Sequence, residues 1–70
     1  MTTADILLVE DESAILELLA FNIEQCGFRA LKAQDAEVAL AQIKQALPDL
    51  ILLDWMLPGC SGIELARRLR

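Results

Sequence analysis

The amino-acid sequence predicts an α/β protein, a doubly wound parallel sheet whose elements alternate in the order βαβαβα. Residues 6–9 (ILLV) and 50–53 (LILL) are uninterrupted aliphatic runs, and strands without polar alternation are typical of parallel sheets that are covered on both faces. The segments between these runs carry apolar residues at helical spacing. We therefore expect helices on both faces of the sheet.

The first strand is expected at residues 6–9, because acidic residues bound the run on each side. An apolar stripe at helical spacing follows it, formed by Ile15, Leu18, Leu19, Ile23 and Cys26. Gly27 comes directly after this stripe, where a residue in the left-handed conformation commonly ends a helix. The first unit is thus a strand followed by a helix.

The second unit begins with residues 28–33, whose imperfect alternation is typical of an edge strand with one wetter face. Asp35 is a plausible N-cap for the next helix, and Pro48 prevents the helix from continuing. The apolar stripe of this helix is expected at Ala36, Ala39, Leu40 and Ile43. A third strand at 50–53 and a third helix at 63–70 complete the order.

Length and composition limit what the chain can be. Seventy residues make at most one small domain, and a hydrophobic fraction of 56% excludes a disordered segment. The net charge of −5 disfavours direct contact with nucleic acid and suits cations or basic partners. The N-terminus has no signal-peptide pattern, and no apolar run is long enough to cross a bilayer, so the sequence predicts a cytoplasmic protein without membrane contact.

Carboxylates follow both aliphatic strands. Glu10 and Asp11 come directly after the first, and Asp54 comes directly after the third. Ligands of open α/β sheets bind outside the carboxyl ends of the strands, so these three side chains share one pocket if the two strands are neighbours. A cluster of like charges is costly without a cation, and Mg²⁺ prefers oxygen ligands. The sequence therefore predicts a magnesium site.

Asp54 is the best candidate for a reactive group, because a rigid strand positions it and turn-forming residues after it keep it exposed. An aspartate in that setting can act as a nucleophile toward phosphorus and form an aspartyl phosphate. Glu10 and Asp11 are better placed as metal ligands. A simpler interpretation exists for each part: the acids after the first strand can complement a helix dipole, with Asp11 or Ser13 as N-cap, and Asp54 can be a turn residue.

The segments VEDE after the first strand, QCGF after the first helix and DLILLDWMLPGCSG through the third strand resemble the receiver domain of two-component response regulators. Within that family, the resemblance is to the phosphate-regulon regulators of the winged-helix class, and it spans the whole chain. It implies a flavodoxin-like, CheY-like fold with strand order 2-1-3-4-5, in which a sensor histidine kinase donates a phosphoryl group to an aspartate. For these 70 residues it implies order 2-1-3.

Position by position, the resemblance implies that Asp54 is the phosphoacceptor. Glu10 and Asp11 match the acidic pair that organises Mg²⁺, and the backbone carbonyl of Met56 matches a further metal ligand, beside Asp54 itself. Receiver domains are signalling domains, so the chain is not expected to be an enzyme. A phosphatase of the haloacid dehalogenase kind is disfavoured, because such enzymes carry a second Asp where Met56 stands.

Receivers of this class extend well beyond residue 70, so residues 1–70 are expected to be the N-terminal part of a receiver domain, without its last strands and without the DNA-binding domain. The edge of the third strand is then exposed, and an exposed apolar edge favours pairing with another chain. We therefore expect a homo-oligomer that forms through this edge. The alternative function is an interaction module that associates through the same edge and is not phosphorylated.

Overall fold

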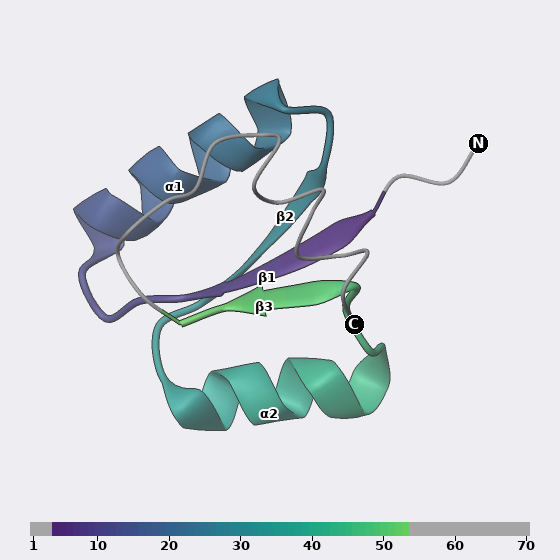
Figure 1. Cartoon of the computed structure of the whole chain (residues 1–70). Helices are drawn as coiled ribbons and strands as arrows, with labels where there is room; N and C mark the ends of the chain where they lie inside the picture. Colours follow the sequence, from purple (N-terminus) through teal and green to yellow (C-terminus); the bar gives the residue numbers. More distant parts are fainter. Residues whose placement is uncertain (1–3, 54–70) are drawn as a thin grey trace.

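A computed structural model of the protein describes residues 4–53 (Figure 1). These residues form three strands and two helices: β1 (Asp5–Val9), α1 (Ser13–Gln25), β2 (Arg29–Ala33), α2 (Ala36–Gln45) and β3 (Leu50–Leu52). The first five elements of the predicted order are thus confirmed. The predicted helix at 63–70 lies outside the described residues.

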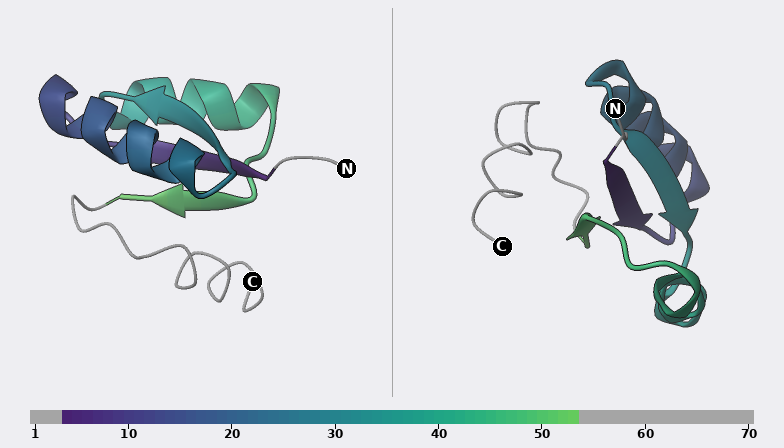
Figure 2. Two further views of the ribbon diagram at one scale, coloured as in Figure 1. Left: turned by 90° about the horizontal axis from the view of Figure 1, so that it is seen from above. Right: turned by 90° about the vertical axis from the view of Figure 1, so that its right-hand side faces the viewer.

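The strands form a parallel sheet in the order β2-β1-β3, as predicted. β1 is central, and its middle residue Leu7 lies between Leu31 of β2 and Ile51 of β3. α1 covers one face of the sheet and α2 the other (Figure 2), so the sheet is doubly wound. This arrangement brings the ends of β1 and β3 to the same edge.

The core has one part on each face of the sheet. Successive side chains of β1 point to opposite faces, so Ile6 and Leu8 pack under α1, whereas Leu7 packs under α2. The α1 face buries Ile6, Leu8, Leu16, Leu19, Ala20, Ile23 and Phe28. Of the residues that the structure describes, the α2 face buries Leu7, Ala33 and Ala39.

The predicted apolar stripes are wrong at single positions. Leu18 of α1 is 60% exposed, while Leu16 and Ala20 are buried beside Leu19. The buried stripe is centred on Leu16, Leu19, Ala20 and Ile23, and a helix turns about 100° per residue, so Leu18 falls outside it. In α2, Leu40 is 57% exposed and Ala39 alone is buried. Residue type alone did not distinguish neighbouring aliphatic positions.

The predicted helix boundaries are largely confirmed. Gly27, with φ of 90°, follows the end of α1, and the Asp35 carboxylate caps α2 by accepting a hydrogen bond from the Val38 N–H at 2.9 Å. α2 ends three residues before Pro48. Neither described helix is long and apolar enough to cross a bilayer.

The third strand differs from the prediction of full burial on both faces. Ile51 is 38% exposed, and Leu53, just after β3, is 74% exposed. The reason is the position of β3, which has β1 as its one neighbour among residues 4–53 and is only partly covered by α2. Ile51 and Leu53 line the space beside α2, so the α2 face of this strand is incompletely covered in the described part of the chain.

Candidate functional site

Glu10 leaves β1 at the carboxyl edge of the sheet, where the sequence predicts a metal site. Its backbone N–H donates to the carbonyl oxygen of Ala33, the last residue of β2, at 3.0 Å. This bond continues the β1–β2 pairing by one residue beyond the strand and fixes where the chain emerges. Glu10 as a whole is half-buried, and its carboxylate makes an exposed hydrogen bond at the carboxyl end of β1.

The turn from β1 into α1 is shaped by the Glu10 side chain. Its Oε1 accepts a hydrogen bond from the Glu12 N–H at 3.1 Å, and the Glu12 carbonyl then accepts from the Leu16 N–H at 2.9 Å to start the helix. Glu12, in extended conformation, is the N-cap residue, and no side chain caps α1. Asp11 is exposed on this turn, one residue after Glu10.

This geometry corrects one interpretation of the acidic run. Neither Asp11 nor Ser13 is the N-cap, since Ser13 is already helical and α1 has no side-chain cap. No acidic residue lies in the first turn of α1 either. The N-cap is instead Glu12, and Glu10 accepts from its N–H just before the helix begins. Glu10 and Asp11 place two adjacent carboxylates directly after the central strand, and carboxylate oxygens are ligands of hard cations.

The other predicted site residues, Asp54 and Met56, lie outside the described residues. Within residues 4–53, no three His, Cys, Asp or Glu side chains come together as a metal-binding group. Glu10 and Asp11 supply two carboxylates, and β3 runs parallel to β1 toward the same edge. The described part of the chain therefore contains one side of the predicted site.

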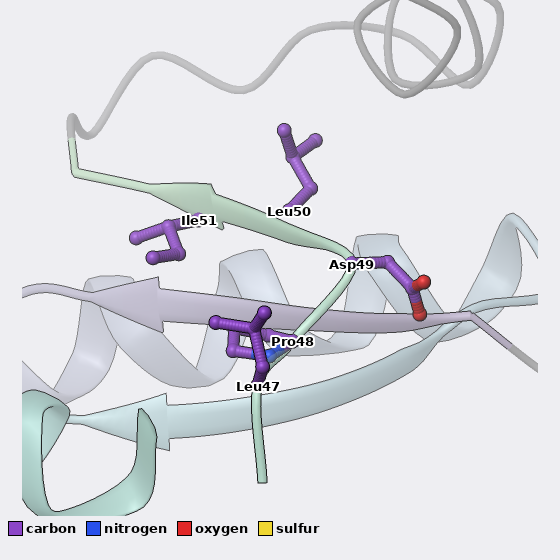
Figure 3. Close-up of a pocket in the computed structure, with 5 residues that line it drawn as sticks. All are labelled: Leu47, Pro48, Asp49, Leu50 and Ile51. Carbon is purple, nitrogen blue, oxygen red and sulfur yellow. The ribbon is translucent and has the colours of Figure 1, made fainter. Parts of the chain in front are cut away.

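Next to this edge, α2 and β3 enclose an apolar groove of about 320 Å³. Its lining is entirely aliphatic: Val9, Ala36, Ala39, Leu40, Ile43, Ile51 and Leu53. Because it offers no polar group, the groove cannot orient a charged ligand and is a packing surface. A second pocket of about 200 Å³ lies at the other end of β3 and is lined by residues 47–51 (Figure 3). Neither described pocket contains the carboxylates of Glu10 and Asp11.

One polar residue that sequence reasoning passed over is Asp49, just before β3. Its Oδ2 accepts a hydrogen bond from the Asp5 N–H at 2.7 Å, and its own N–H donates to the Asp5 carbonyl at 2.8 Å. In the sequence, Asp49 is distinguished only by its place between a proline and an aliphatic run. Acidic residues are common in turns before strands, so this place does not indicate a specific hydrogen bond.

Comparisons with known proteins agree with this geometry. The family profile of the response regulator receiver domain matches residues 6–70. The phosphate regulon transcriptional regulatory protein PhoB of Pseudomonas aeruginosa is 53% identical over 70 residues, which are 100% of this chain and 31% of that protein. PhoB of Escherichia coli is 51% identical over 65 residues, or 93% of this chain and 28% of that protein.

A third relative is the alkaline phosphatase synthesis transcriptional regulatory protein PhoP of Bacillus subtilis, which is 46% identical over 65 residues. The chain thus spans about a third or less of the length of these curated relatives. The profile match covers nearly all of the sequence, and the parallel sheet in the order β2-β1-β3 with a helix on each face is the arrangement that the resemblance implied. The chain belongs to the response regulator receiver domain family.

Proposed function

We propose that the chain is the N-terminal part of a receiver domain that accepts a phosphoryl group on Asp54 from a sensor histidine kinase. The observation that carries this proposal is the register of β1 and β3, in which Ile6 pairs with Leu50 and Leu8 with Leu52. Glu10 and Asp54 each follow two residues after the paired Leu8 and Leu52 in the sequence. The acceptor would then lie beside the carboxylates that follow β1.

Mg²⁺ is the cofactor that we propose for this site. The residues present fit it: Glu10 and Asp11 offer carboxylate oxygens at the sheet edge, and only Oε1 of Glu10 is engaged by the Glu12 N–H. Asp54 and the backbone carbonyl of Met56 would supply the remaining protein ligands. When bound, the ion neutralises the charge of the phosphoryl oxygens during transfer.

The proposed reaction is a displacement at phosphorus. A carboxylate oxygen of Asp54 forms the new O–P bond while the N–P bond of the kinase phosphohistidine breaks. The electron pair of that bond stays on the imidazole nitrogen, which takes a proton from solvent. Glu10, fixed by its backbone bond to Ala33, holds one side of the site in place. The product is an acyl phosphate that signals through its charge, so the domain acts as a switch and not as an enzyme.

The wider role follows from the relatives. Their names describe transcriptional regulators, and the chain matches about a third of the P. aeruginosa relative. We propose that this segment receives the signal, whereas a separate domain of the regulator contacts DNA. The excess of eleven acidic over six basic residues is unfavourable for direct contact with nucleic acid, and the setting that we propose is the cytoplasm, away from membranes.

A second proposal concerns association of two copies. β3 has β1 as its single strand neighbour among residues 4–53, and Ile51 and Leu53 expose 38% and 74% of their surface. Strands with an open apolar edge tend to pair with another chain. We propose that this 70-residue chain forms homo-oligomers through that edge, with or without phosphorylation. Sedimentation velocity over a dilution series should show a concentration-dependent oligomer, and a single monomeric species throughout would refute it.

The phosphorylation proposal is tested by intact-mass measurement after incubation with Mg²⁺ and acetyl phosphate. We expect a single phosphoryl adduct in the native chain, none after removal of the metal with a chelator, and none in Asp54→Asn. Asp35→Asn is the matched control, because its amide oxygen can still cap α2 and residue 35 is at a helix start away from β3. An adduct that persists in Asp54→Asn would contradict the assignment of the acceptor.

A further inference from the structure

The amino end of β3 is tied to β1 by a reciprocal pair of hydrogen bonds between Asp5 and Asp49. The Asp49 N–H donates to the Asp5 carbonyl at 2.8 Å, and the Asp5 N–H donates to Oδ2 of Asp49 at 2.7 Å. Figure 3 shows the Asp49 carboxylate beside the start of β1. Both residues are half-buried, so water competes only partly for these bonds.

The side chain of Asp49 replaces a backbone acceptor at this point. The preceding residue, Pro48, is buried and has no N–H, so the pairing of this segment with β1 begins at the Asp49 N–H. On the other side of β1, Arg29 completes the arrangement: its N–H donates to the Ala4 carbonyl at 2.8 Å, and its Nε lies 3.7 Å from Oδ1 of Asp5. The start of β1 is thus fixed between both neighbours.

The Asp5–Asp49 hydrogen bonds matter for β3 because the sequence of this strand does not by itself define its register against β1. The strand has three residues, Leu50–Leu52, and pairs with one strand in the described part of the chain. Register is normally set by which side chains are apolar, since a slip by one residue exchanges the two faces. In the run LILL, every position is aliphatic, so a slipped strand would still place an aliphatic side chain at each position. The reciprocal Asp5–Asp49 bonds are polar and specific for one pairing.

We propose that Asp49 is a positioning residue for phosphorylation: it fixes the register of β3 (Leu50–Leu52) against β1, and this strand directly precedes the acceptor Asp54 in the sequence. This inference rests on the proposed function. A slip by one residue would move β3, and the chain that follows it, by about 3.3 Å relative to Glu10. Mg²⁺ requires oxygen ligands at about 2.0–2.1 Å in near-octahedral geometry, so such a shift would disrupt the shared metal site.

The test compares Asp49→Ala with Asp49→Asn. The amide oxygen of Asn can still accept from the Asp5 N–H, whereas Ala leaves that N–H without its acceptor. Asp35→Ala is the control, because it removes the same side chain, the same charge and the same kind of bond to a backbone N–H, but at the start of α2. A purely structural role of Asp49 would make Asp49→Ala behave like Asp35→Ala.

The readout is the dissociation constant for Mg²⁺, followed by the fluorescence of Trp55, the only tryptophan and the neighbour of Asp54. We expect Asp49→Ala to weaken Mg²⁺ binding by roughly tenfold or more, as supporting residues of metal sites do. Asp49→Asn and Asp35→Ala should stay within about twofold of the native chain, well short of that loss. The rate of adduct formation with acetyl phosphate at subsaturating Mg²⁺ should follow the same order.

Sucrose, which is excluded from protein surfaces, is added to all samples so that a weakened Asp49→Ala chain remains folded, as checked by circular dichroism. Equal Mg²⁺ affinity in Asp49→Ala and the native chain would overturn this inference and leave the proposed function intact. An Asp35→Ala chain that loses as much affinity as Asp49→Ala would also overturn it. A native chain that binds Mg²⁺ but forms no adduct would instead refute the phosphorylation proposal alone.

Discussion

The two faces of the sheet are packed to different degrees. Among residues 4–53, seven side chains are buried in one cluster under α1, whereas three are buried under α2. The α2 face instead retains an apolar groove of about 320 Å³ between α2 and β3. Among the described residues, buried side chains are therefore concentrated on the α1 face, against which Leu50 and Leu52 of β3 also pack. β3 has no fully buried side chain, and polar bonds between Asp5 and Asp49 hold its amino end.

The largest expected effect of a substitution is on the α1 face. Leu19 is 5% exposed and belongs to the main cluster. Leu19→Ala should lower the free energy of unfolding by about 3 kcal/mol, since it removes buried methyl groups and leaves a cavity. A chain of this length is expected to have a total stability of roughly 4–10 kcal/mol. Urea denaturation followed by circular dichroism should show a much lower midpoint.

If the midpoint instead fell only slightly, the α1 face would not be the main source of stability, and the comparison between the faces would fail. The slope of the transition should be unchanged, because the substitution alters stability and not the surface exposed on unfolding.

The same substitution on the other face should have little effect. Leu40 of α2 is 57% exposed, although it lines the groove. Leu40→Ala loses only part of the transfer free energy of a leucine, and alanine has the higher helix propensity, so we expect a loss of less than about 0.5 kcal/mol. The same urea experiment measures it. A loss as large as that of Leu19→Ala would mean that the groove is occupied in solution, for example by the partner copy in the proposed oligomer.

Much of the fold could be predicted from the sequence because its signals are local. The run at 6–9, the glycine after α1 and the capping Asp35 each act within a few residues of themselves, and all are confirmed. The phase of the buried stripe in α1 was less predictable, since Leu16, Leu18 and Leu19 are chemically alike. Which of them is buried depends on the angle at which the helix lies on the sheet, and that is set by packing.

The candidate site was predictable to a similar extent. Parallel strands bring their carboxyl ends to one edge, so the position of Glu10 and Asp11 followed from the order of elements. The bond from the Glu12 N–H to Glu10 was not predictable, because several acids in the run compete for the same role. The bond between Asp5 and Asp49 joins residues that are 44 apart in sequence, and local sequence patterns do not predict such distant partners.

The smallest expected effect lies on the exposed outer side of the α1 face. Nζ of Lys32 in β2 is 2.8 Å from Oε1 of Glu17 in α1, and both side chains are largely exposed, at 42% and 68%. The hydrogen bond from Lys32 to Glu17, together with the attraction between their charges, raises the pKa of Lys32 above its ordinary value. Lys32→Gln should therefore lower the urea midpoint only slightly, because solvent and salt screen exposed pairs.

The pH dependence of this pair has a definite sign. The pKa of Lys32 is higher in the folded than in the unfolded chain, so the pair stabilises the fold fully below the unfolded-state pKa and loses this contribution as pH rises through the folded-state pKa. The difference in midpoint between the native chain and Lys32→Gln should thus be present at neutral pH, shrink in strongly alkaline buffer and shrink at about 1 M salt. Glu17→Gln should reproduce it, and adding Lys32→Gln to Glu17→Gln should change little more. A difference that is unaffected by both salt and pH would show that Lys32 acts through its aliphatic stem packed on α1, which would extend the well-packed face of the sheet to its rim.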